Sequence, residues 1–230
     1  MKKNNYRLFS IIASFVIFTI LLLSGCVNYD QQTTLNYDGS GTMKIHYWSK
    51  MSNFSMGTSL GKFDFDEQKA KENFTSANTE VKSVKMEDKL DDSTKHVNLE
   101  LTFKDINKLP DAKGFVEVKP SWKEGKDGME LKYVLLKDTS AASNMGASDY
   151  TVTYTFIMPG EIISTNATKK EGNTLTWTYK VSDLGKDIEM TANVKKAKGK
   201  TCGIFGMILG AGLIGLAYYT QRNRKKLLKT

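Results

Sequence analysis

Hydrophobic and polar residues alternate along most of the chain between residues 31 and 195. In residues 42–49, for example, Met43, Ile45 and Tyr47 alternate with a lysine, a histidine and a tryptophan. A period of two residues is typical of a β-strand that buries one face. We therefore predict about ten strands. They cover residues 31–37, 42–49, 80–87, 95–104, 115–123, 129–136, 151–158, 161–168, 175–181 and 188–195.

Short turn sequences separate several of these strands. The Asp-Gly-Ser-Gly sequence at 38–41, residues 91–93 and the Gly-Lys-Asp-Gly sequence at 125–128 each connect two alternating segments. Glycine and aspartate favour the backbone conformations of tight hairpin turns. These three connections therefore predict antiparallel hairpins.

One segment has a helical period instead. From Asp66 onward, Ala70, Phe74 and Ala77 recur at helical spacing, and Asp64 or Asp66 can cap the first turn. We predict one main helix of about three turns. The same acidic sequence, residues 64–67, could hold a hard cation, but it lacks the spacing of a calcium loop, so helix capping is favoured.

Many strands with hairpin-length loops and a single helix indicate an α+β, mostly β domain. We predict an antiparallel curled sheet or a barrel-like domain with one main helix. The small polar residues 139–148 are predicted to form a loop, or alternatively the rim of a cavity.

The N-terminal segment predicts export. Lys2, Lys3 and Arg7 precede residues 8–23, which carry no charge, and this order is that of a secretory signal peptide. The chain then continues as Leu-Ser-Gly-Cys at residues 23–26.

That sequence resembles the bacterial lipobox. The resemblance implies that Leu23, Ser24 and Gly25 are recognised by the signal peptidase, that the Cys26 thiol receives a diacylglycerol, and that residues 1–25 are removed. The alternative is an uncleaved N-terminal membrane helix with an incidental cysteine.

A second apolar segment begins at Gly203 and ends at Tyr219. Its seventeen uncharged residues would span about 25 Å as a helix, which is at the short end for crossing a bilayer. The basic residues after it, in 220–230, fit a cytoplasmic end. We predict a transmembrane helix over residues 203–219, with a buried core helix as the alternative. Its small-residue spacing would permit a helix-mediated dimer, but we favour a single helix.

The formal charge of +8 does not indicate a nucleic-acid-binding protein. Residues 1–25 contain three basic residues and no acid, and residues 201–230 contain five basic residues and no acid. Residues 26–200 therefore have no net charge. The excess of positive charge lies beside the two apolar segments, where it sets membrane orientation.

Candidate chemistry in the exported part is sparse. Only Cys26 and Cys202 are present, which excludes a disulfide within the domain and a cysteine-based zinc site. His46 and His96 have no local catalytic or metal-binding motif, and solvent-facing positions are favoured for both. We therefore expect no enzymatic activity, no cofactor and no metal. Residues 28–198 should fold alone as a monomeric, mostly β domain.

Aromatic residues on the predicted strands allow two interpretations. The favoured one is that they fill a core; the other is that some line a cavity for an acyl chain or a sugar. They are Tyr47, Trp48, Phe103, Tyr133, Tyr154, Phe156, Trp177 and Tyr179.

The order of several motifs resembles a known family. The lipobox precedes the turn at 38–41, and a Met-Pro-Gly sequence at 158–160 precedes residues 162–166 and Trp177. Together with the C-terminal apolar segment and basic tail, they resemble the LppM-like bacterial lipoprotein domain, over most of residues 26–219. The resemblance implies an exported antiparallel β domain with helices, tethered near the membrane and in contact with lipids or glycolipids. It implies no catalytic residue.

These observations divide the chain into a signal peptide (1–25), an exported β-rich domain (26–200), a transmembrane helix (203–219) and a basic cytoplasmic tail (220–230). We expect a bacterial membrane lipoprotein, held through acylated Cys26 and the helix, with its main domain extracytoplasmic. Its expected function is to bind lipid or glycolipid at the cell envelope. The alternative is a non-enzymatic scaffold that binds another envelope protein. No nucleic-acid partner is expected.

Overall fold

The first hairpin forms as the turn at 38–41 predicts. The computed structural model describes residues 27–54, 57–137 and 150–196. Strands β1 (Asn28–Leu35) and β2 (Gly41–Lys50) pair antiparallel, with Leu35 opposite Gly41. Gly39 adopts a φ of 85°, which suits glycine in such a turn.

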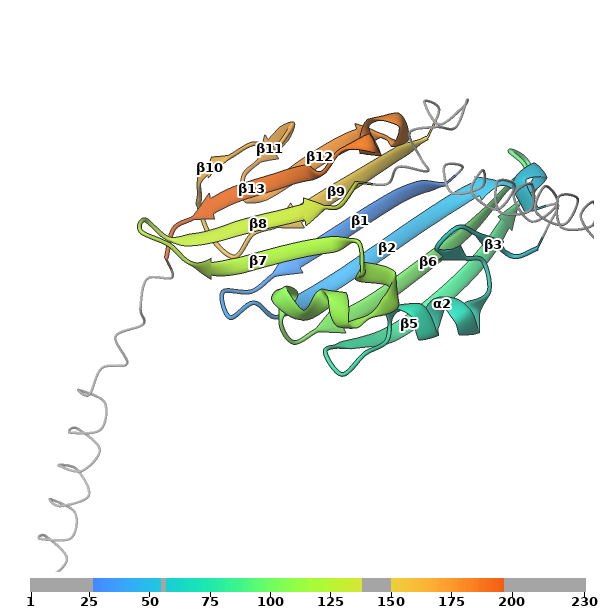
Figure 1. Cartoon of the computed structure of the whole chain (residues 1–230), viewed down its shortest axis with the longest axis horizontal. Helices are drawn as coiled ribbons and strands as arrows, with labels where there is room; N and C mark the ends of the chain where they lie inside the picture. Colours follow the sequence, from blue (N-terminus) through green and yellow to red (C-terminus); the bar gives the residue numbers. More distant parts are fainter. Residues whose placement is uncertain (1–26, 55–56, 138–149, 197–230) are drawn as a thin grey trace, which may run out of the picture. The chain divides into compact units, whose positions relative to one another are not determined.

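The hairpin lies in the middle of a seven-stranded sheet, in the order β11-β12-β9-β1-β2-β6-β5 (Figure 1). Its other members are β5 (Thr79–Lys89), β6 (Thr94–Phe103), β9 (Thr151–Ile157), β11 (Lys169–Glu171) and β12 (Thr174–Lys180). Strand β1 pairs with β9 in parallel, with Tyr29 opposite Val152, and the remaining pairs are antiparallel. The sheet is therefore mixed.

Four further strands form a separate antiparallel sheet in the order β10-β13-β8-β7. They are β7 (Val118–Glu124), β8 (Met129–Leu135), β10 (Ile162–Thr165) and β13 (Ile188–Val194). Strands β3 (Ser59–Leu60) and β4 (Phe63–Asp64) form a small two-stranded sheet.

The one α-helix of the described residues is α2 (Glu67–Phe74). The Asp66 carboxylate accepts a hydrogen bond from the Lys69 N–H at 2.9 Å, which confirms the predicted cap. The helix is shorter than predicted because Thr75 already has an extended backbone, so Ala77 lies beyond its end. The described residues also contain short 3-10 helices: η1 (Met51–Phe54), η2 (Ile106–Asp111), η3 (Lys113–Phe115) and η6 (Val181–Gly185).

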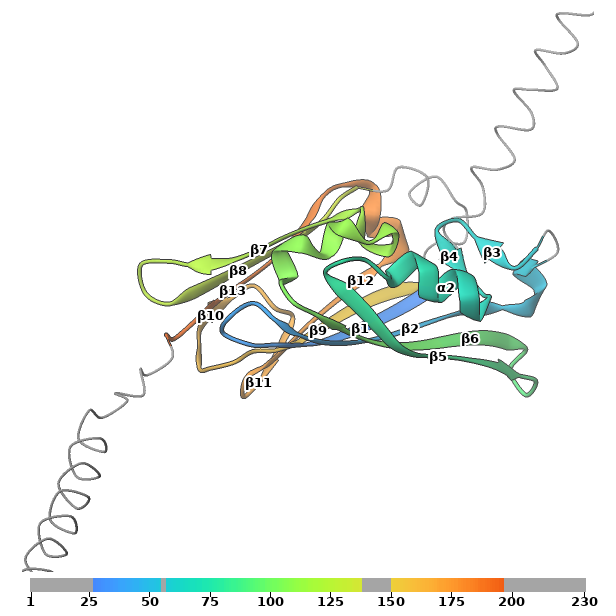
Figure 2. The same cartoon turned by 90° about the horizontal axis from the view of Figure 1, so that it is seen from below.

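The mostly β character of the domain is confirmed, but the predicted curled or closed antiparallel sheet is wrong. A barrel needs its two edge strands to pair with each other. Here β11 and β5 are the edge strands of the large sheet and do not pair with each other, and four strands form a second sheet instead. Figure 2 shows this second sheet, α2 and the 3-10 helices before β7 on one side of the seven-stranded sheet.

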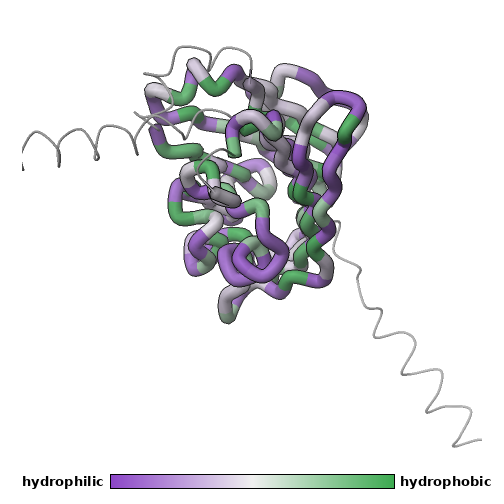
Figure 3. Tube along the Cα trace, turned by 90° about the vertical axis from the view of Figure 1, so that its right-hand side faces the viewer, coloured by the Kyte–Doolittle hydropathy of each residue, from purple (hydrophilic) through white to green (hydrophobic). Residues whose placement is uncertain are grey.

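The hydrophobic core lies between these layers. Inward and outward residues alternate along the strands, and Figure 3 shows the same alternation in hydropathy. Ring contacts join the two sheets: the Tyr133 ring of β8 lies 5.8 Å from Tyr154 and 5.4 Å from Phe156, both on β9. Of the eight aromatic residues singled out in the sequence, Trp48 and Tyr179 are half-buried and the others are buried. The core interpretation is therefore confirmed for most of them.

Candidate functional site

The residues that the sequence assigns to membrane attachment lie outside the described residues. This holds for Leu23, Ser24, Gly25 and Cys26, and for the predicted helix over 203–219. Among the described residues, no helix is long and apolar enough to span a bilayer. The lipidation and transmembrane predictions stay predictions.

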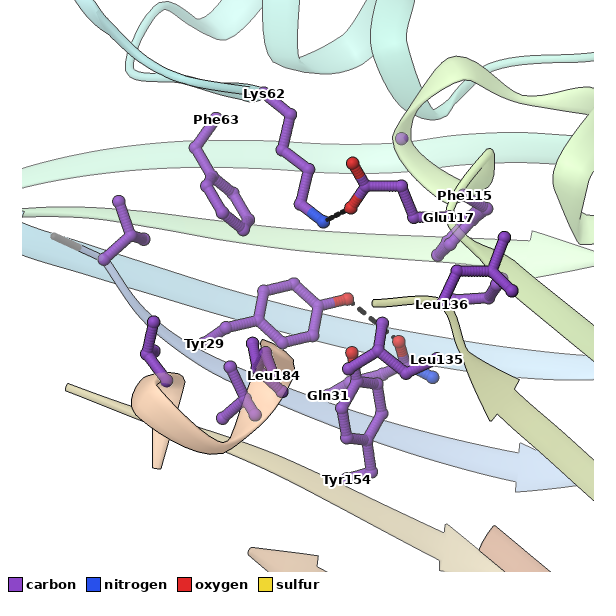
Figure 4. Close-up of a pocket in the computed structure, with 15 residues that line it drawn as sticks. Tyr29, Gln31, Lys62, Phe63, Phe115, Glu117, Leu135, Leu136, Tyr154 and Leu184 are labelled. Atoms are coloured by element: carbon purple, nitrogen blue, oxygen red, sulfur yellow. Dashed lines mark hydrogen bonds and ion pairs between the residues drawn. The ribbon is translucent and has the colours of Figure 1, made fainter. Parts of the chain in front are cut away.

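The structure does show a cavity of about 150 Å³ at one end of the space between the two sheets (Figure 4). Strands β1 and β9 of the large sheet form one wall, and the end of β8 with the start of β7 forms another. The turn between β3 and β4 and the helices η3 and η6 close the remaining sides. The site therefore draws on segments from the whole described chain.

Most of the lining is aliphatic or aromatic. Six of these side chains are Val27, Phe63, Phe115, Leu135, Val152 and Leu184. An apolar cavity of this volume can hold a molecule about the size of benzene. Pockets for complete drug-sized ligands measure roughly 300–1,000 Å³. The cavity as it stands therefore fits the end of one alkyl chain or one small ring.

Polar groups meet the cavity on the large sheet. The Tyr29 hydroxyl donates a hydrogen bond to Gln31 Oε1 at 2.9 Å, and Gln31 Nε2 donates to Thr33 Oγ1 at 3.0 Å. All three side chains belong to inward positions of β1, and Gln31 is only 2% exposed. These residues were not among the candidates from the sequence, although polar residues at the inward positions of a strand are a visible signal of such a feature.

The tyrosines beside Gln31 are neutral hydrogen-bonding groups. Burial, and then the neighbouring phenols, hold the pKa of Tyr29 and the pKa of Tyr154 well above the usual value. Burial likewise raises the pKa of Tyr133. Gln31 lies close enough to lower that pKa slightly, yet no well-formed hydrogen bond reaches the buried Tyr133 hydroxyl within the described residues.

One ion pair lies on the exposed side of the cavity. Lys62, in the turn between β3 and β4, contacts the Glu117 carboxylate (Figure 4). Their side chains are 41% and 40% exposed. Such pairs contribute little to stability in water, about 0–1 kcal/mol. Their effect on the cavity is that each charge is neutralised by the other.

The two histidines form a second polar cluster, on the outer face of the large sheet. His46 Nε2 lies 2.8 Å from His96 Nδ1, and the Trp48 ring stacks 4.5 Å from the His46 ring. His96 is 4% exposed, so its predicted solvent-facing position is wrong, whereas His46 is half-buried. The sequence did not predict this pair because it depends on the register of β2 and β6. His46 lies opposite Asn98 and Trp48 opposite His96, so the two histidines are diagonal neighbours.

This cluster predicts a pH-dependent stability. Burial lowers the pKa of both histidines below the ordinary value of 6.5. Below about pH 6.5 the unfolded chain therefore binds protons that the folded domain does not, and stability falls with pH. We expect the thermal midpoint of residues 28–198 to drop between roughly pH 7.5 and pH 5.5.

The matched control is a double variant, His46→Gln with His96→Gln, which cannot titrate at these positions. Its midpoint should drop less over the same pH range than that of the wild type. An equal drop in both proteins would show that other groups cause the pH dependence.

The acidic sequence at 64–67 serves structural contacts. Asp66 caps α2, and the Asp64 carboxylate accepts hydrogen bonds from the Ser59 hydroxyl, at 2.6 Å, and from the Asn73 amide. No group of three or more histidine, cysteine, aspartate or glutamate side chains suited to a metal ion occurs within the described ranges.

No protein-family model and no curated protein matches this chain. Among solved structures it matches the folded domain of LppM from Mycobacterium tuberculosis, determined by NMR. The match covers 76% of this chain and 93% of the LppM domain, at 18% sequence identity and a TM-score of 0.44. LppM is also the protein for which the family suggested by the sequence motifs is named.

Proposed function

We propose that this protein is a bacterial membrane lipoprotein whose exported domain binds the apolar part of a lipid or glycolipid in the cavity between its two sheets. The observation that carries the proposal is the cavity itself. Protein interiors are closely packed, and a void much larger than a water molecule is unusual in them. Here about 150 Å³ stays open among apolar side chains.

The volume limits what the cavity takes. The end of one alkyl chain would fit, while the rest of the ligand would stay outside or in a membrane. Each methylene group that enters an apolar site contributes about 0.8 kcal/mol. A few methylene groups therefore suffice for weak, reversible binding.

The proposed location at the cell envelope is supported by the sequence on both sides of the domain. Leu23 to Cys26 would supply a lipid anchor, and the uncharged residues 203–219 a membrane helix. The first described residue, Val27, is 3% exposed and lines the cavity. An anchor at Cys26 would thus be attached one residue away from the proposed binding site.

Filling the cavity tests the proposal. Val152 lies on β9 and lines the cavity, so Val152→Phe would occupy part of its volume. We expect this variant to lose most of its labelling by an alkyl diazirine, a photoreactive hydrocarbon, when the full chain is reconstituted in lipid nanodiscs. Mass spectrometry of the cross-linked peptides gives the site and the yield.

The matched control is Val134→Phe. Val134 lies on β8, between two residues that face the core, and its own side chain is half-buried. Both variants therefore carry the same substitution on a strand, but only one fills the cavity. The proposal fails if the diazirine labels no cavity peptide of the wild type, or if it labels Val152→Phe and Val134→Phe equally.

A further inference from the structure

The polar groups that line the cavity indicate the chemistry of its ligand. Resting on the proposed function, we propose that it selects an uncharged molecule that bears a hydroxyl or carbonyl group beside its apolar part, and that Gln31 recognises this group. Gln31 is thus a specificity-determining residue for the proposed site.

Gln31 keeps hydrogen-bonding capacity that a ligand could use. A primary amide has two N–H donors and an oxygen with two lone pairs. Gln31 uses one donor toward Thr33 and one acceptor site toward Tyr29. Within the described residues, no other well-formed hydrogen bond reaches this amide, although the unpaired Tyr133 hydroxyl lies beside it. One donor and one acceptor site are therefore open to a ligand in a side chain that is 2% exposed and lines the cavity. A ligand hydroxyl could use both, and a ligand carbonyl could use the donor.

Strand β1 differs from its neighbour in the residues that it places inward. The inward positions of the neighbouring strand β2 include Met43, Ile45 and Tyr47, whereas β1 places Gln31 and Thr33 inward. Replacing both partners of a buried hydrogen bond by apolar groups of the same shape is often neutral or stabilising. The Gln31 amide gives the buried Tyr29 hydroxyl a partner, and a ligand would use the donor and the acceptor site that this bond leaves over.

The charges around the cavity favour an uncharged ligand. Lys62 is the one basic residue and Glu117 the one acidic residue of the described lining, and they form an ion pair with each other. The other polar groups at the lining, Tyr29 and Tyr154, are neutral phenols. A carboxylate or an ammonium group inside the cavity would lose its hydration without gaining an opposite charge, which is costly. An uncharged head group avoids this cost.

The experiment compares four alkyl diazirines of equal chain length on the full chain in nanodiscs. One is a hydrocarbon, one an alcohol, one a carboxylate and one a quaternary ammonium. Each is applied to the wild type, to Gln31→Leu and to Val152→Phe. Because every protein variant is measured in the same membranes, partition of a probe into lipid cancels in the comparison.

We expect the alcohol to label cavity peptides of the wild type, and this labelling to fall about tenfold in Gln31→Leu, the factor for one lost hydrogen bond. The hydrocarbon should label both proteins equally, which also shows that the variant is folded. The carboxylate and the ammonium should label the wild type no more than they label Val152→Phe.

Gln32→Leu is the matched control, because Gln32 is the next residue of β1 and faces outward. It should leave alcohol labelling unchanged. Equal labelling by the alcohol and a charged probe, or alcohol labelling that Gln31→Leu leaves intact, would overturn the inference while hydrocarbon labelling still supported the cavity. Loss of hydrocarbon labelling in the wild type would instead refute the proposed function.

Discussion

Replacing Trp177 by alanine is expected to lower the free energy of unfolding by about 3–5 kcal/mol. Trp177 lies on β12, is fully buried and packs edge-to-face on Phe156, with ring centroids 5.9 Å apart. Its indole N–H donates to Asn166 Oδ1 at 2.9 Å, and that oxygen also accepts from the Thr191 N–H of β13 at 2.8 Å. The variant therefore loses core packing and a connection between the two sheets.

Urea unfolding of residues 28–198, followed by far-ultraviolet circular dichroism, measures this loss. Small domains are stable by roughly 5–15 kcal/mol, so a loss of this size is a large part of the total stability. Trp48→Ala is the control, because it removes the same side chain from a half-buried position on the outer face. A loss at Trp48 as large as that at Trp177 would contradict the packing described for Trp177.

Replacing Cys26 by alanine is expected to abolish lipidation and cleavage of the precursor. The reaction needs the thiol as nucleophile, and alanine has none. The wild type should yield an N-terminal peptide that starts with a diacylglyceryl cysteine, whereas the variant should keep residues 1–25. Mass spectrometry of membrane fractions distinguishes the two.

Cys202→Ala serves as its control, because it removes the only other thiol and should change neither modification nor cleavage. An intact Met1 with an unmodified Cys26 in the wild type would contradict the lipoprotein prediction. In that case the alternative of an uncleaved membrane helix would be favoured.

The sequence predicts local structure well in this protein. The turns at 38–41, 91–93 and 125–128 each connect antiparallel neighbours, and Asp66 caps the helix as expected. These features depend on residues close together in the chain, so their signals are local. The period of two likewise predicts which residues of β2 are buried.

The same local signals do not predict pairing between strands that lie far apart in the chain. Strands β1 and β9 are separated by more than a hundred residues, and alternation within a strand does not show which strand pairs with it or whether the pair is parallel. The arrangement in two sheets depends on these pairings. A cavity lined by strand aromatics was left open by the sequence, and Tyr154 does line one, but its position could not be predicted. It lies between segments from seven different elements, and apolar residues around a void have the same pattern as apolar residues in a filled core.

The two ends of the described domain lie about one strand apart. Val27 precedes β1, and at the other end of that strand the Tyr37 hydroxyl donates to the Lys195 carbonyl at 3.1 Å. Eight residues of β-strand extend about 26 Å. A body held at one point can tilt in every direction, whereas a body held at two separated points can only roll about the line that joins them. If the proposed attachments before Val27 and after Lys196 both exist, β1 lies roughly along the line that joins them. Rotation about this line would leave the cavity beside Val27 close to the membrane surface.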